Sequence, residues 1–197
     1  DKERIDAIQM IKNEGEKIDS EKILELLKSD DFVKKDAGCY LLNKNFNFFL
    51  KETKNPEEIL PILEELIKDE DYDVKLTAIP NYIKTIFKTK NPEEILPILE
   101  KLIEEEDWRV KQEIAIALNE QEDLKEFLSI LKELIENKYG DVRIAAIPSY
   151  IKTIFETKNP EEVLLRLEEL IENKYDDVRI AAIPSYIKII FETKNPK

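Results

Sequence analysis

Residues 55–90 read NPEEILPILEELIKDEDYDVKLTAIPNYIKTIFKTK, and this segment decides the fold. Its apolar residues fall at helical rather than alternating spacing, in two blocks separated by a polar turn at residues 68–73. Asn55, Pro56 and the two glutamates that follow are typical of a helix N-terminus, because Asn accepts hydrogen bonds from free N–H groups and proline needs no partner there. The segment predicts two antiparallel helices joined by a short turn.

The segment recurs along the chain. The string Thr-Lys-Asn-Pro begins at residues 53, 89, 157 and 193. Alignment of the copies predicts repeats of about 36 residues at 55–90, 91–122, 123–158 and 159–194, of which the second is shortened. Residues 133–160 and 169–196 differ only at Gly140/Asp176 and Thr153/Ile189. So close a match indicates recent duplication or deliberate design, and both interpretations remain open.

The repeats predict the fold class and the domain organisation. We expect a single all-α domain over residues 1–197, a right-handed α-solenoid of antiparallel helix pairs. Residues 1–54 have diverged from the repeat and are interpreted as N-terminal capping helices, the first of them over residues 2–13. Proline recurs inside the second helix of three repeats, where it predicts a fixed kink rather than a hinge. These residues are Pro80, Pro148 and Pro184.

The start of each second helix carries a recognisable motif. Residues 141–146 and 177–182 both read DVRIAA, and residues 73–78 read DVKLTA. The pattern resembles the Asp-Val-Arg-x-x-Ala signature of HEAT repeats, from which residues 109–111 depart because the aspartate is lost. The resemblance implies a HEAT-like α-solenoid with second helices lining a concave face, and a scaffold or adaptor function. It also implies that the Asp and Arg side chains link adjacent repeats, which we favour over ligand binding.

Composition argues against several classes of function. The formal net charge of −13 repels phosphate backbones, so we expect no nucleic-acid partner. The chain has no histidine, which removes the commonest general base and the Ser-His and Cys-His nucleophile systems. Its three glycines do not form a phosphate-binding loop. We therefore expect no enzyme activity, no cofactor and no metal site.

The sequence also bears on location. It contains no apolar run of about 18 residues, so we expect no membrane partner. Cys39 is the only cysteine, which rules out an intramolecular disulfide and is typical of a reducing compartment. We expect a cytoplasmic location. The chain begins at Asp1 rather than at methionine, which is typical of a trimmed fragment.

The second helices carry the candidate binding residues. Segments 141–156 and 177–192 have no net charge and segment 73–88 carries +2, whereas the first-helix segments 55–70, 91–106 and 159–174 carry −5, −5 and −3. A near-neutral to mildly basic layer of this kind predicts a protein or peptide partner with acidic character. The predicted partner-binding residues are Asn81, Lys84, Ser149, Lys152, Ser185, Lys188 and Trp108. The alternatives that the lysines are merely solvated and that Trp108 is a packing residue remain open, and core positions are favoured for the equivalent tyrosines.

We predict a non-catalytic protein-binding scaffold. One alternative is a designed or purely structural repeat array without a natural ligand. A second is a DNA-repair enzyme built from HEAT-like repeats, which the acidity of the chain disfavours. The exposed apolar residues expected on the final helix, including Ile189 and Ile190, also predict end-to-end self-association.

Overall fold

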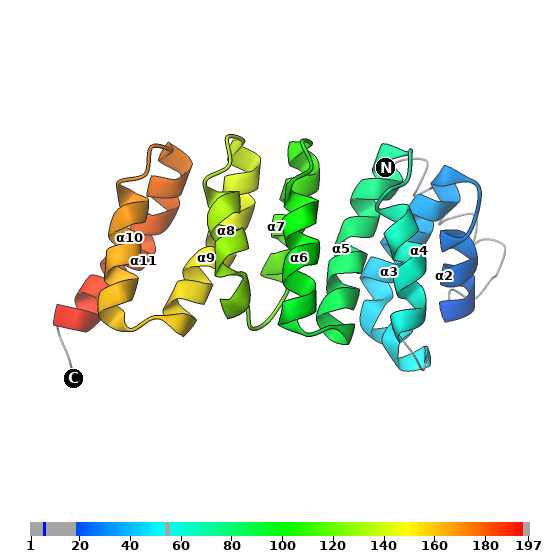
Figure 1. The fold of residues 1–197 in the computed structure, drawn as a ribbon, viewed down its shortest axis with the longest axis horizontal. Coiled ribbons are helices and arrows are strands. Elements are labelled where there is room, and N and C mark those ends of the chain that lie inside the picture. The colour runs from blue at the N-terminus through cyan, green and yellow to red at the C-terminus, as the bar shows by residue number, and fades with distance from the viewer. Residues whose placement is uncertain (1–5, 7–18, 54–55, 195–197) are drawn as a thin grey trace. The chain divides into compact units, whose positions relative to one another are not determined.

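A computed structural model describes residues 6, 19–53 and 56–194 of the chain. The regular structure of these residues is entirely helical and falls into two compact units, residues 1–91 and residues 92–197 (Figure 1). The all-α, helix-pair prediction is therefore confirmed for the described residues. Apart from residue 6, the helix predicted over residues 2–13 lies outside them, and the single domain and the right-handed course of the whole array stay predictions.

The first unit contains the diverged helices and one repeat. Its described helices are α2 (Ser20–Leu27), α3 (Phe32–Glu52), the 3-10 turn η1 (Pro56–Ile59), α4 (Leu60–Leu66) and α5 (Tyr72–Thr89). Helix α3 packs against both α2 and α5, while α4 packs against α5. Helix α3 has no proline, but its backbone leaves the helical region at Asn45 (φ −116°, ψ 19°). In the repeat of this unit, the first helix begins as the 3-10 turn η1 and continues as the α-helix α4.

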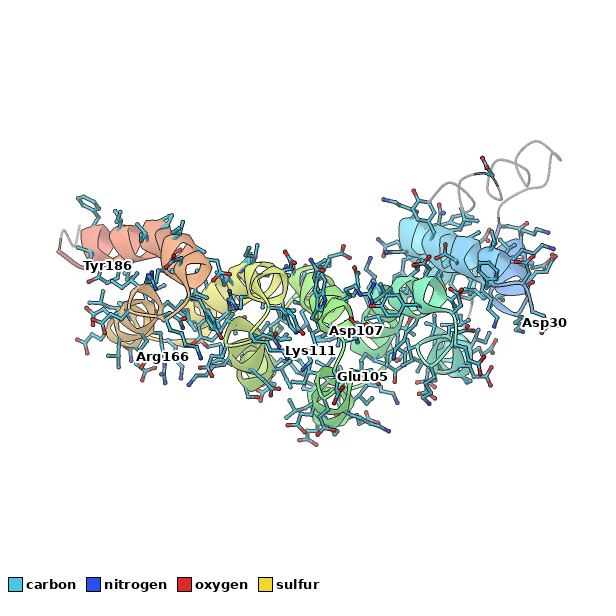
Figure 2. All side chains as sticks on the ribbon, turned by 90° about the horizontal axis from the view of Figure 1, so that it is seen from above. Asp30, Glu105, Asp107, Lys111, Arg166 and Tyr186 are labelled. Carbon is cyan, nitrogen blue, oxygen red and sulfur yellow. The ribbon has the colours of Figure 1, made fainter. Side chains whose placement is uncertain are left out.

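The second unit contains three helix pairs. They are α6 (Pro92–Ile103) with α7 (Trp108–Asn119), the 3-10 turn η2 (Lys125–Phe127) and α8 (Leu128–Ile135) with α9 (Gly140–Thr157), and α10 (Pro160–Ile171) with α11 (Asp176–Lys194). Within this unit, α6, α8 and α10 form one layer and α7, α9 and α11 form a second (Figure 2). Helix α9 packs against α7 on one side and α11 on the other. The three pairs show the predicted helix-pair arrangement, while the predicted repeat boundaries stay a prediction.

Local sequence accounts for where the helices begin. The Asn159 side chain accepts a hydrogen bond from the amide of Glu162 at 2.9 Å, as the Asn-Pro-Glu-Glu pattern predicts. Asp71 and Asp107 cap α5 and α7 in the same way. Helices α5, α9 and α11 each run through their internal proline without a break in the helix. The caps and turns therefore place each second helix in the same register relative to its loop.

Candidate functional site

In the second unit, one side of α9 and α11 is exposed. Residues spaced by four lie on the same side of a helix. Three positions spaced by four residues are exposed on each helix, and each of the three on α9 has an equivalent on α11. We call this set the second-helix face, and its residues are Ile144, Pro148, Lys152, Ile180, Pro184 and Lys188. The face combines apolar side chains, prolines and lysines, a mixture that suits the apolar and acidic sides of a protein segment.

The two lysines of this face are held only weakly. The Lys152 ammonium lies 3.9 Å from Glu156 in an exposed i,i+4 pair. Pairs of this kind contribute about 0.3–0.5 kcal/mol, so they do not fix the side chain. The Lys188 ammonium lies 5.5 Å from the centre of the Phe155 ring, a cation–π contact that links α11 to α9. Both ammonium groups can therefore turn toward an acidic partner at little cost.

The equivalent residues of the first unit have a different role. Asn81 is fully buried, and its amide donates hydrogen bonds to the carbonyl groups of Cys39 at 2.8 Å and Thr77 at 3.1 Å. Lys84 is half-buried and donates to the Asn43 amide oxygen at 2.5 Å. Buried and bonded in this way, Asn81 cannot touch a partner, and Lys84 is tied to α3. Our prediction for Asn81 mistook a bond between helices for a binding group.

Of the two serines, only Ser149 is buried. Ser149 is buried and its hydroxyl donates to the Asn119 amide oxygen, while the Asn119 amide donates to the Ala145 carbonyl at 2.8 Å. This network joins α7 to α9 close to the internal proline of α9. Ser185 is half-buried on α11. The structure thus separates the predicted set into the exposed Lys152 and Lys188, the inter-helix bonds of Asn81, Lys84 and Ser149, and the half-buried Ser185 and Trp108.

Trp108 lies at the start of α7 and contacts an aromatic ring of the next loop. Its ring centre is 5.8 Å from that of Tyr139, at an interplanar angle of 32°. Beside this pair is a cavity of about 410 Å³ lined by Glu104, Glu106, Lys111, Asn137, Lys138 and Tyr139. Figure 2 shows Lys111 at this loop end of the helices, together with Glu105 and Asp107. The lining carries both signs of charge and selects no single ligand. Trp108 is half-buried, and its role as a binding anchor stays a prediction.

The aspartate and arginine of the repeat motif link neighbouring repeats, as predicted. Arg143 donates from Nε to Asp177 Oδ1 at 3.0 Å and from Nη2 to Asp177 Oδ2 at 2.7 Å. Its Nη1 donates to the Asn137 carbonyl at 2.7 Å, and its guanidinium lies 3.6 Å from the centre of the Tyr175 ring. We call the Arg143–Asp177 pair the latch. It joins α9 to α11 with the bidentate geometry that favours arginine over lysine.

The latch determines the ionisation of its carboxylate. Burial opposes the charged form of Asp177, but hydrogen bonds from Arg143 and from the Val178 amide outweigh it. The pKa of Asp177 consequently lies below its ordinary value. A comparable ion pair joins Lys35 of α3 to Asp69 at 2.6 Å in the first unit. Charged side chains at the starts of second helices thus hold successive pairs together.

The helix pairs and the motif agree with a known family. Residues 59–151 match the family model for HEAT repeats. This part of the chain belongs to the HEAT repeat family. No curated protein matches the chain. HEAT repeats typically serve as protein-interaction scaffolds.

Two further findings concern the described residues. None of the described helices is both long enough and apolar enough to span a membrane. Nor does this part of the chain bring together three or more His, Cys, Asp or Glu side chains in an arrangement that could hold a metal ion.

The predicted core positions of the tyrosines are confirmed for Tyr82 and Tyr150, which are buried, while Tyr186 is half-buried. Burial, together with Glu64, raises the pKa of Tyr82 to about 12.

Sequence reasoning overlooked the apolar half of the second-helix face, and the exposed positions predicted for Ile189 and Ile190 were wrong, since Ile189 is buried and Ile190 is half-buried. Ile144 and Ile180 are 58% and 68% exposed, although an amphipathic interpretation assigns isoleucine to the core. The available signal was that α9 and α11 carry apolar residues around most of their circumference. Helix α9 packs against α7, α8 and α11, and an apolar side chain such as Ile144 that faces none of them stays exposed.

Proposed function

We propose that this chain is a non-catalytic HEAT-repeat scaffold that binds an acidic, amphipathic protein segment on the second-helix face. The observation that carries the proposal is the pairing of Ile144 with Lys152 on α9 and of Ile180 with Lys188 on α11. Each helix offers an apolar side chain and, eight residues further on, an exposed cation. A protein segment with apolar and acidic residues along one side would bury its apolar residues against the isoleucines and pair its acidic residues with the lysines.

The charge distribution of the chain favours an acidic partner on the second-helix face and disfavours one on the first-helix layer. The chain carries −13 overall, and the first-helix layer holds much of that charge. An acidic segment is repelled by most of the molecule and attracted locally by Lys152 and Lys188. The same total charge repels nucleic acid. A cytoplasmic location belongs to this proposal as well, because a buried Cys39 outside any disulfide is compatible with a reducing compartment.

The test is a capture experiment with charge-matched variants. The wild-type chain and a Lys152→Glu, Lys188→Glu variant are used as baits in nuclease-treated lysate, and bound proteins are identified by mass spectrometry. The control is Lys132→Glu, Lys174→Glu, which changes the charge equally. Lys132 lies 3.9 Å from Glu136 and Lys174 lies 4.8 Å from the Tyr175 ring centre, so their contacts resemble those of the test pair.

We expect a partner that the control retains and that the Lys152→Glu, Lys188→Glu variant loses. Its binding should weaken as salt rises, because the attraction is between exposed charges. Circular dichroism verifies that both variants are folded. A partner retained by both variants would contradict the assignment of the site, and a partner released by nuclease would favour nucleic-acid binding instead.

A further inference from the structure

The contact between α7 and α9 lacks the latch that joins α9 to α11. Lys111 of α7 aligns with Arg143, and Asp141 of α9 aligns with Asp177. Asp141 is exposed, and Lys111 forms no ion pair with any residue that the structure describes. The cavity of about 410 Å³ opens here, between the loop that precedes α7 and the loop that precedes α9. Because Lys111 itself lines this cavity, the cavity takes the place of the missing latch.

Trp108 accounts for the absence of a latch between these two helices. It aligns with Gly140 of α9. A Cβ at Gly140 would lie 3.2 Å from Asp177 Oδ2 and 3.5 Å from Arg143 Nη2, so even a small side chain at this position crowds the latch. A side chain as large as tryptophan takes up the space that a paired carboxylate and guanidinium need. The indole of Trp108 packs instead against the ring of Tyr139, with 5.8 Å between the ring centres.

The two half-buried side chains of the cavity lining both offer hydrogen-bond donors that have no acceptor among the described residues. One is the Lys111 ammonium group. The other is the side-chain NH₂ group of Asn137, whose amide oxygen is already used because it accepts from the Tyr139 amide at 3.0 Å. Partly buried donors are costly to leave unpaired. These two groups therefore favour a ligand that brings negatively charged oxygen acceptors.

We propose that this cavity binds a carboxylate group from outside the chain, in the role that Asp177 has in the latch. The α7–α9 contact keeps the cation of the latch, as Lys111, and lacks only a bonded carboxylate. One carboxylate oxygen accepts from Lys111 and the other from the Asn137 amide. A volume of about 410 Å³ admits an acidic side chain or the terminal carboxylate of a peptide. Neither residue belongs to the second-helix face, so this proposal and the proposed function succeed or fail separately.

Two glutamates of the lining oppose an anion and make its binding weak. Glu104 and Glu106 are both exposed, so water screens their charge more than it screens the half-buried Lys111. Lys138, also in the lining, adds a second ammonium group. For a single carboxylate we expect a dissociation constant on the order of 1–10 mM. Replacing both glutamates by glutamine should tighten the binding of an anion, whereas it would weaken the binding of a cation.

Trp108 provides a local reporter, because it is the only tryptophan of the chain and lies beside the cavity. Its indole N–H resonance is followed in proton–nitrogen NMR spectra of the whole chain at constant ionic strength. The probes are N-acetylglutamate N-methylamide, which presents a side-chain carboxylate, and N-acetylglycine, which presents a terminal carboxylate. The tighter of the two identifies the source of the group. N-acetylglutamine N-methylamide is the neutral control, and N-acetyllysine N-methylamide is the cationic one.

We expect the indole resonance to shift to saturation with a carboxylate probe and to stay unchanged with the neutral and cationic controls. Lys111→Gln should weaken binding at least about tenfold, since it removes a charged hydrogen bond. Lys132→Gln is the matched control, because Lys132 is an exposed lysine of α8 outside the lining, and it should bind as the wild type does. The Glu104→Gln, Glu106→Gln variant should bind more tightly. Circular dichroism establishes that the variants are folded.

A second measurement needs no ligand. Asp141→Asn should change the urea unfolding midpoint of the wild-type chain little, because Asp141 takes no part in a latch. In a Trp108→Gly, Lys111→Arg background, which restores the residues of the α9–α11 contact, the same change should lower the midpoint. The proposal is overturned by no shift with either carboxylate probe, by an equal shift with a control probe, by a Lys111→Gln variant that binds as the wild type does, or by weaker binding in the glutamine double variant. It is also overturned if Asp141→Asn lowers the midpoint of the wild-type chain as much as in the restored background, since Asp141 would then fill the site itself.

Discussion

Helices α9 and α11 have nearly the same sequence and different surroundings. Ile147 of α9 is buried, whereas Ile183 of α11 is largely exposed. Arg143 is bonded to the aspartate of the following repeat, whereas Arg179 is bonded to Asp176 of its own helix. The sequence of a HEAT-repeat helix therefore determines its secondary structure, while its neighbour determines which of its side chains belong to the core. Repeat arrays are well suited to such comparison, because each repeat contacts chiefly its neighbours.

The largest expected effect comes from truncating the same isoleucine on both helices. Ile147→Ala should lower the free energy of unfolding by about 2–5 kcal/mol, since it leaves a cavity in a packed interface. Ile183→Ala should cost less than about 1 kcal/mol, because the side chain is already in water. Urea unfolding followed by circular dichroism at low micromolar concentration measures both changes. Equal losses would mean that α11 is as well covered in solution as α9.

The latch gives a second comparison, between Asp177 and Asp176. Asp177→Asn should cost about 1–3 kcal/mol at neutral pH, because it removes the bidentate charged bond to Arg143. Asp176→Asn should cost less than about 1 kcal/mol, since the Asp176–Arg179 pair is exposed. The measurement is again urea unfolding, and a larger loss for Asp176→Asn would contradict the assignment of the latch.

The latch also predicts a pH dependence. The pKa of Asp177 is lowered in the folded chain, so its contribution to stability is complete above the unfolded carboxyl value and is lost as pH falls through the folded pKa. The difference in stability between the wild type and Asp177→Asn should therefore be constant above about pH 4 and shrink below it. A difference that instead increased toward low pH would show that Asp177 is not stabilised as a carboxylate.

The helix starts could be predicted from sequence because they depend on local patterns, and the latch was implied by the resemblance of the motif to that of HEAT repeats. The Asn159 cap follows from the preference of helix ends for particular side chains. The Arg143–Asp177 bond follows from a motif that recurs in every well-preserved repeat. The cap depends on one helix and its loop alone, whereas the latch was expected because the motif supplies an arginine and an aspartate in successive repeats.

The candidate site was predicted only in part, because it depends on the neighbouring helix. Lys84 and Lys152 are equivalent by alignment, yet Lys84 is bonded to Asn43 of α3 while Lys152 is exposed. Asn81 was predicted to face a partner, but its position lies beside α3, where its amide binds the Cys39 carbonyl. Helical periodicity separates apolar from polar sides of a helix. It does not tell which polar side chain faces the adjacent helix and which faces water.

The smallest expected effect sharpens the comparison most directly, because it converts one residue of α9 to its α11 counterpart. Gly140→Asp places a carboxylate next to Asp177, whereas Gly140→Asn adds nearly the same volume without charge. The Asp variant should be less stable than the Asn variant by about 0.5–1 kcal/mol, and added salt should narrow the gap. In an Asp177→Asn background the order should reverse, since an acidic residue at a helix N-terminus is otherwise favourable. If Asp is as stable as Asn beside an intact Asp177, the two carboxylates do not meet.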